Sequence, residues 1–146
     1  MVALLAVGVT TCSLATARAA IRATRAEVPS SESGAPPVRA DPAFADRVAC
    51  LGPVLAVSIA SGGTAGDTSW VAFVRAGTGW RVVKAEQGYK LGLFPRGDRL
   101  EVVQPVYRRR DPNCCPTGGY DRVLYGFDGR QLVVTRRWHT RRFRRP

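Results

Sequence analysis

Histidine, lysine and acidic residues are scarce in this 146-residue chain, and their scarcity excludes several kinds of active site. His139 is the only histidine, and lysine occurs only at Lys84 and Lys90. A Ser-His-Asp or Cys-His arrangement would have to use His139, whose neighbouring arginines disfavour its protonated form. We therefore expect a protein that is not an enzyme and that holds no cofactor.

Long apolar segments are also missing, except at the N-terminus. The segment from Met1 to Ala17 has no charged residue, but its apolar part is shorter than the ~20 residues that span a bilayer. Ala17-Arg18-Ala19 has small residues at the two positions that signal peptidase requires. We interpret residues 1–20 as a cleaved export signal. Lipid attachment at Cys12 is one alternative, and an uncleaved segment is another.

The next segment lacks aromatic and branched apolar residues almost entirely. Residues 21–43 consist mostly of Ala, Arg, Ser, Glu, Gly and Pro. Such a composition buries too little apolar surface to offset the entropy lost on ordering. The sequence therefore predicts a disordered linker at 21–43, a β-rich disulfide-stabilised domain at 44–138 and a basic tail at 139–146.

Alternating apolar residues predict strands in this domain. In Ser69–Arg75, Val71 and Phe73 fall on one face, and Trp70, Ala72 and Val74 on the other. Residues 46–60 are ambiguous, because Gly52-Pro53 would break a helix capped by Asp46. The fold class expected is mainly β: a single antiparallel sheet of about five strands joined by hairpins, with α+β possible through one packed helix. Further strands are expected at 80–84, 89–94, 100–107, 122–127 and 131–138.

Four cysteines allow a disulfide in an exported protein. Cys114 and Cys115 are adjacent, and Cα atoms ~3.8 Å apart lie below the usual ~4.4–6.8 Å of a disulfide. We therefore predict that Cys50 pairs with Cys114 or Cys115. A Cys114–Cys115 ring and the absence of any disulfide remain as alternatives.

Other constellations near the cysteines are weaker. Cys50, Cys114 and Cys115 with His139 could form a Cys3His zinc site, but the usual two-residue spacer is missing, so no metal is predicted. Asp111 and Asp121 could be an acid–base pair, yet turn capping and pairing with nearby arginines are favoured. The glycine-rich loop at 62–66 is not followed by lysine, which disfavours a phosphate loop.

Arginine is abundant, in contrast to the other titratable residues. The 22 Lys and Arg residues outnumber the 11 Asp and Glu residues, which gives a net charge of +11. A basic surface attracts an anionic envelope polymer or a membrane surface, and nucleic acid is a weaker candidate. A solvated tail that aids solubility is the alternative. The candidate binding residues are Arg108, Arg109, Arg110, Arg136, Arg137, Arg141 and Arg142.

The most distinctive string runs from Asp111 to Asp121 and reads DPNCCPTGGYD. With the preceding Pro105-Val106-Tyr107-Arg108 and the aromatic turn at 125–129, it resembles small uncharacterised secreted proteins and lipoproteins of actinobacteria, similar to the LppP/LprE type. The resemblance implies a domain that faces the cell envelope, and it brings no catalytic residues.

The function predicted from these features is that of a non-catalytic exported cell-envelope protein, a binding or structural module that is secreted or attached to the outer face of the cytoplasmic membrane. It is expected to be a monomer with an unknown ligand. The alternative is a polyanion or nucleic-acid binder that acts through the arginine-rich C-terminus.

Overall fold

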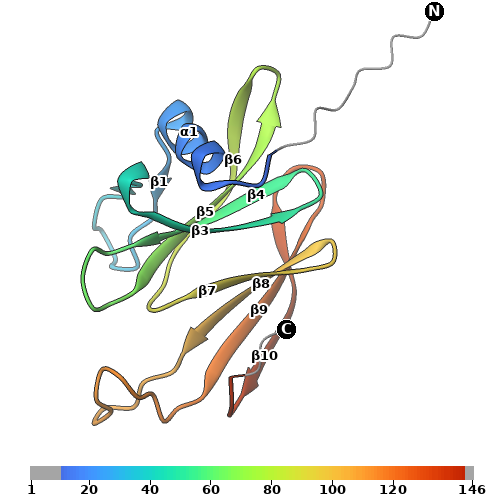
Figure 1. The fold of residues 1–146 in the computed structure, drawn as a ribbon. Coiled ribbons are helices and arrows are strands. Elements are labelled where there is room, and N and C mark those ends of the chain that lie inside the picture. The colour runs from blue at the N-terminus through green and yellow to red at the C-terminus, as the bar shows by residue number, and fades with distance from the viewer. Residues whose placement is uncertain (1–10, 144–146) are drawn as a thin grey trace, which may run out of the picture.

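The computed structural model describes residues 11–143, and within them the chain forms one α-helix, one short 3-10 helix and ten strands. Figure 1 shows the helix above a first sheet and a second sheet below it. The first sheet contains β3 (Ala45–Leu51), β4 (Val54–Ala60), β5 (Asp67–Ala76) and β6 (Gly79–Gln87). The second sheet contains β7 (Gly92–Arg96), β8 (Arg99–Pro105), β9 (Tyr120–Phe127) and β10 (Leu132–Thr140).

Both sheets are antiparallel meanders in which each strand pairs with the next one along the chain. Two-residue turns join β3 to β4, β5 to β6 and β7 to β8. Gly52 begins the first of these turns with φ 51°, in the left-handed region that glycine adopts without steric cost. Gly52-Pro53, ambiguous in the sequence, is thus a hairpin turn.

The first sheet is the middle layer because both of its faces are apolar. Trp70, Ala72 and Val74 of β5 face the second sheet, whereas Val71 and Phe73 face the helix, which confirms the predicted alternation. β4 is buried at six of its seven residues. A sheet that is apolar on both sides requires a covering layer on each.

Helix α1 (Leu14–Thr24) is one of those covering layers. The Ser13 hydroxyl accepts a hydrogen bond from the Thr16 amide at 3.1 Å and caps the helix N-terminus. Ala17, Ala20 and Ile21 lie on one helix face and are buried against the first sheet. Part of the segment interpreted as a cleaved signal is therefore packed structure, and residues 1–10 lie outside the described residues.

The segment expected to be a disordered linker also contacts the domain. It contains the paired strands β1 (Glu27–Val28) and β2 (Val38–Arg39), followed by the 3-10 helix Pro42–Phe44. Val28 and Ala40 are buried in the same cluster as α1. The prediction of a linker was wrong at these positions because a few small apolar residues suffice to seat the segment on the first sheet.

The prediction of a single sheet of about five strands was wrong, although the mainly β class is correct. The structure has sheets of two, four and four strands. The chain leaves the first sheet after β6, where Lys90 has φ 47°. The second sheet then packs Leu100, Val102 and Tyr125 against the first sheet.

The predicted pairing of Cys50 with Cys114 or Cys115 was also wrong. Cys50 is bonded to Cys12, with their Cα atoms 5.9 Å apart. Side chains alternate along β3, so Ala49 and Leu51 face the second sheet while Cys50 faces α1. Cys50 therefore points away from the sheet that carries Cys114 and Cys115. A bonded Cys12 sulfur is also not available for acylation, which argues against lipid attachment there.

Candidate functional site

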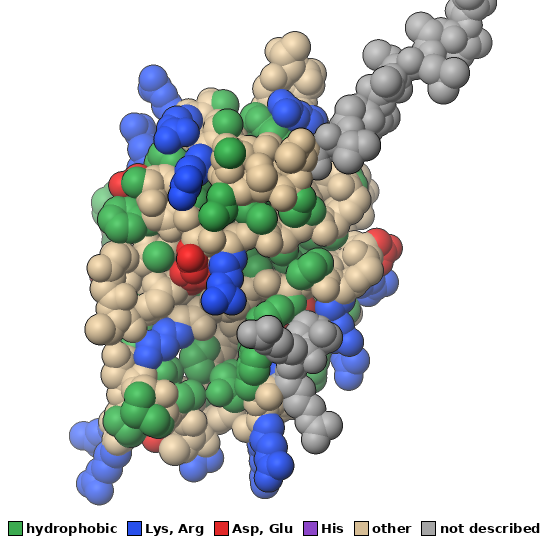
Figure 2. All heavy atoms as spheres, viewed as in Figure 1, with side chains coloured by type: hydrophobic (Ala, Val, Ile, Leu, Met, Phe, Trp, Pro, Cys, Tyr) green, Lys and Arg blue, Asp and Glu red, His purple; other side chains and the backbone are tan. Residues whose placement is uncertain are grey.

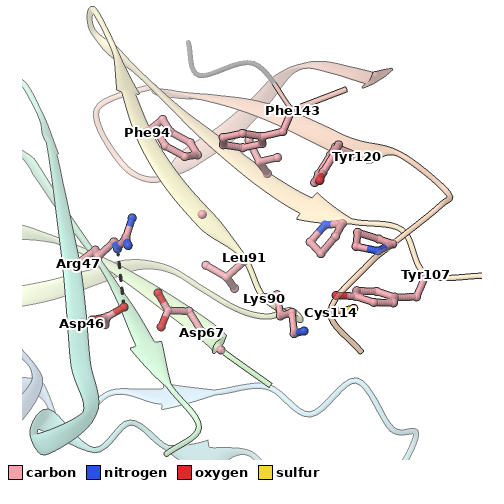
Figure 3. Close-up of a pocket in the computed structure, with 15 residues that line it drawn as sticks. Asp46, Arg47, Asp67, Lys90, Leu91, Phe94, Tyr107, Cys114, Tyr120 and Phe143 are labelled. Atoms are coloured by element: carbon pink, nitrogen blue, oxygen red, sulfur yellow. Dashed lines mark ion pairs between the residues drawn. The ribbon is translucent and has the colours of Figure 1, made fainter. Parts of the chain in front are cut away.

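A groove of about 500 Å³ lies where β3 of the first sheet runs beside β7 of the second (Figure 3). Leu91, Gly92 and Val103 line its apolar part. The remaining lining residues are Asp46, Arg47, Gly66, Asp67, Lys90, Phe94, Pro105, Tyr107, Cys114, Pro116, Tyr120 and Phe143. Pockets of roughly 300–1,000 Å³ are the size that accommodates small organic ligands.

Two carboxyl groups, which we call the carboxyl pair, stand at one end of the groove. Asp46 lies on β3 and Asp67 begins β5. Asp67 is 9% exposed, and its Oδ2 accepts a hydrogen bond from the buried Ser58 hydroxyl at 2.6 Å. Burial raises the pKa of Asp67, and the neighbouring Asp46 carboxyl adds to this increase. Burial and the second carboxyl therefore both favour the protonated form of Asp67.

Two cations line the groove, and neither fully neutralises the carboxyl pair. Arg47 Nε is 3.9 Å from Asp46 Oδ2, and the Arg47 side chain is 70% exposed. Lys90 instead donates a hydrogen bond to the Asn113 carbonyl and lies over the Tyr107 ring, 5.3 Å from its centroid. Figure 3 shows the Lys90 ammonium directed toward Tyr107 and Cys114. The Lys90 side chain therefore lines the groove and also contacts the neighbouring loop.

Three aromatic side chains, which we call the aromatic wall, lie at the other end of the groove. Phe143 follows β10, and its ring centroid is 5.8 Å from that of Phe94 and 5.5 Å from that of Tyr120. These residues come from β7, β9 and the segment after β10, so only the fold brings them together (Figure 3). Nothing in their sequence spacing predicted the cluster.

The cysteine loop, residues 106–119, borders the groove. Cys114 and Cys115 are bonded to each other, so the alternative of a ring is present. The Asp111 carboxylate accepts hydrogen bonds from the Thr117 amide at 2.8 Å, the Arg108 amide at 2.7 Å and the Thr117 hydroxyl at 2.7 Å. These bonds lower the pKa of Asp111. The turn-capping role predicted for Asp111 is confirmed.

The predicted arginines divide into two groups. Pro105, Tyr120 and Thr140 lie side by side across β8, β9 and β10, so the loop with Arg108–Arg110 and the segment with Arg141–Arg142 leave the same end of the second sheet. Figure 2 shows Lys and Arg side chains projecting around this lower end. We call Arg108, Arg109, Arg110, Arg141 and Arg142, all exposed, the basic end.

Arg136 and Arg137 are not part of the basic end. They lie in the interior of β10, opposite Leu124 and Val123. The Arg136 guanidinium lies 4.6 Å from the centroid of the Trp138 ring. The predicted tail also begins later than expected, because β10 continues to Thr140.

The sequence did not single out one buried ion pair on the outer face of the second sheet. Glu101 is 0% exposed, and its Oε1 accepts a hydrogen bond from Nη1 of Arg122 at 3.1 Å. Glu101 Oε2 has no hydrogen-bond partner among the residues that the structure describes. Phe143 covers this pair, with its centroid 5.6 Å from the Arg122 guanidinium.

Two of the groups considered for catalysis or metal binding, His139 and Asp121, contact each other. His139 Nδ1 is 2.8 Å from the Asp121 carboxylate, and the backbone register places both at the start of β9 and the end of β10. Asp121 therefore pairs with His139, whereas an arginine partner was predicted. The four cysteines form two disulfides, which leaves no thiolate for the Cys3His alternative. Among residues 11–143, no group of three His, Cys, Asp or Glu side chains could hold a metal ion.

No family model, curated protein or solved structure matches this chain. The resemblance of the cysteine loop to actinobacterial envelope proteins stays a prediction. Over the part of the chain that the structure describes, no helix is long and apolar enough to cross a membrane. Any functional conclusion therefore depends on the geometry above.

Proposed function

We propose that this chain is an exported, non-catalytic binding module of the cell envelope, and that the basic end attaches it to an anionic polymer. The observation that carries the proposal is the convergence of Arg108–Arg110 and Arg141–Arg142, more than thirty positions apart in the chain, at one end of the second sheet. Arginine guanidinium groups bind phosphate and carboxylate groups through paired hydrogen bonds.

The loop that presents three of these arginines has a fixed shape. Asp111 holds both ends of the turn, and the Asn113 carbonyl accepts a hydrogen bond from the Tyr107 hydroxyl at 2.8 Å. The Asn113 side chain accepts another from the Tyr89 hydroxyl at 2.5 Å. A loop ordered before binding loses less conformational entropy when a ligand attaches.

Two disulfides support export, since such bonds persist in oxidising compartments and are rare in the cytosol. The bond between Cys12 and Cys50 favours a mature chain that retains Cys12.

The proposal is tested by measuring the binding of fluorescein-labelled inorganic polyphosphate at NaCl concentrations between about 50 and 300 mM. Salt weakens phosphate binding strongly over roughly this range. We expect R109Q/R110Q and R141Q/R142Q each to weaken binding and to reduce the log–log salt slope by roughly one unit for each phosphate that the variant no longer neutralises. The C-terminal arginines are substituted rather than deleted, because a chain that ends at Val134 would also lack most of β10.

The matched control is R22Q/R39Q, which removes the same charge from exposed positions on α1 and β2. It should leave polyphosphate affinity nearly unchanged. Equal weakening by the control would show that net charge alone drives binding and would overturn the assignment to the basic end.

A further inference from the structure

The groove combines two features that favour the same kind of ligand. At one end, the aromatic wall offers ring faces, which carry partial negative charge and attract organic cations. At the other end, the carboxyl pair attracts cations directly (Figure 3). Apolar side chains of Leu91 and Val103 also line the groove. A ligand that satisfies both ends has a cationic head and an apolar body.

Arg47 and Lys90 leave room for such a head. A distance of 3.9 Å between Arg47 Nε and Asp46 Oδ2 is too long for a hydrogen bond, and the Arg47 side chain is mostly solvated. Lys90 contacts the Asn113 carbonyl and the Tyr107 ring. A ligand cation beside the carboxyl pair would therefore displace only a loose, solvent-exposed contact.

The charge of the whole chain makes this groove unusual. A molecule with net charge +11 attracts anions over most of its surface. The groove differs from that general surface, because its two carboxyls, Asp46 and Asp67, balance the charges of Arg47 and Lys90. Binding of a cation at this position cannot result from net charge.

We propose that the groove binds an organic ammonium ion, with the ammonium group beside the carboxyl pair and its apolar body against the aromatic wall. This site adjoins the basic end but shares no residue with it, so it adds a second ligand class to the proposed function. Free amines and amino groups carried on larger envelope molecules share this chemistry.

Three probes of similar shape separate charge from apolar contact: 2-phenylethylammonium, the neutral 2-phenylethanol and the anionic 3-phenylpropionate. Each is titrated into the full chain at pH 7, and binding is followed by two-dimensional amide NMR. We expect the ammonium probe to bind about tenfold tighter than the alcohol, since a charge-pair contact contributes on that scale. Amide shifts should centre on Gly66 and Gly92, which line the groove.

Two variants with different expected patterns test the two ends. Asp46→Asn should reduce the preference for ammonium over alcohol from about tenfold to about threefold or less, since one of two attracting charges is removed. Phe143→Ala should weaken both probes by a similar factor and keep their ratio. Both side chains are partly exposed, so neither change empties the core. Asp98→Asn, which removes an equally negative but 95% exposed side chain, should change nothing.

The pH profile adds a third test. Asp67 has a raised pKa, and the charged groups facing it are Asp46, Arg47 and Lys90 at the groove. Because an ammonium ion favours the ionised carboxyl, its binding should tighten as pH rises through the pKa of Asp67 and then level off. The alcohol should show no such dependence.

Equal affinity for ammonium and alcohol, tighter binding of the anion, or unchanged selectivity in Asp46→Asn would overturn the inference. Amide shifts outside the groove would also overturn it. These outcomes leave polyphosphate binding by the basic end untouched, so failure of one proposal is distinguishable from failure of the other.

Discussion

Glu101 and Arg122 form a pair of opposite charges in a place where the sequence pattern predicts a solvent-facing position. The strand alternation puts Leu100 and Val102 toward the first sheet, which leaves Glu101 on the outer face of the second. That face is covered at this point, and Arg122 is only 4% exposed. A buried charge needs compensation by a charged or hydrogen-bonding partner.

We expect Glu101→Ala to reduce the free energy of unfolding by roughly 3–5 kcal/mol, since it leaves the buried Arg122 guanidinium without this carboxylate. The double variant Glu101→Leu/Arg122→Met should recover much of the loss, because neither charge then remains buried. Urea unfolding measures both. Glu32→Ala, at an exposed position, is the control and should change stability by roughly 0.5 kcal/mol or less. A double variant that is no more stable than Glu101→Ala would contradict the pairing.

The two disulfides act at different scales of the fold. Cys12–Cys50 joins the start of α1 to β3 across 38 positions, whereas Cys114–Cys115 closes a ring between neighbours within one loop. In the chain-entropy model, stabilisation grows with the length of the closed loop. Only the first bond therefore holds separate elements of the fold together.

We expect C12S/C50S to lower the free energy of unfolding by about 4 kcal/mol, from the entropy of the loop that this bond closes. C114S/C115S changes the same number of cysteines and is the matched control. It should alter the cysteine loop beside the groove but lower the free energy of unfolding far less. Urea unfolding under non-reducing conditions gives both values. Equal costs for the two variants would show that Cys12–Cys50 does not anchor α1 to the sheet.

Sequence periodicity predicted the strands from 69 to 138 well, because each has one face toward a core. β3 remained ambiguous, since its burial is irregular and Asp46 and Arg47 interrupt the pattern. The predicted export signal at residues 1–20 overlaps the first part of helix α1, whose alanines fit both a peptidase site and close packing on a sheet. Small residues alone do not distinguish these two roles.

The groove depends on contacts that local pattern does not encode. The carboxyl pair comes from β3 and β5, and the aromatic wall from three segments that span nearly fifty positions. The sequence singled out the arginines and the cysteine loop as candidates, and their role in binding stays a prediction. It could not tell that Arg108–Arg110 and Arg141–Arg142 lie together while Arg136 and Arg137 lie elsewhere, because this follows from the register of the second sheet.

At the scale of the whole molecule, the oxidation state of the four cysteines leads to one prediction about the mature protein. Cleavage after Ala19 would remove Cys12 and the buried Ala17, and would leave Cys50 without its partner. We therefore expect the protein from its native host to be exported with Cys12 retained. Its intact mass should fall below that of the reduced chain by the four hydrogens that two disulfides release. Mass spectrometry of the culture filtrate and envelope fraction, with and without reductant, measures this.

The mass of a chain that begins at Ala20, or of a chain with a lipid on Cys12, would contradict the anchoring of α1. Recovery of a reduced chain from the cytosol would contradict export.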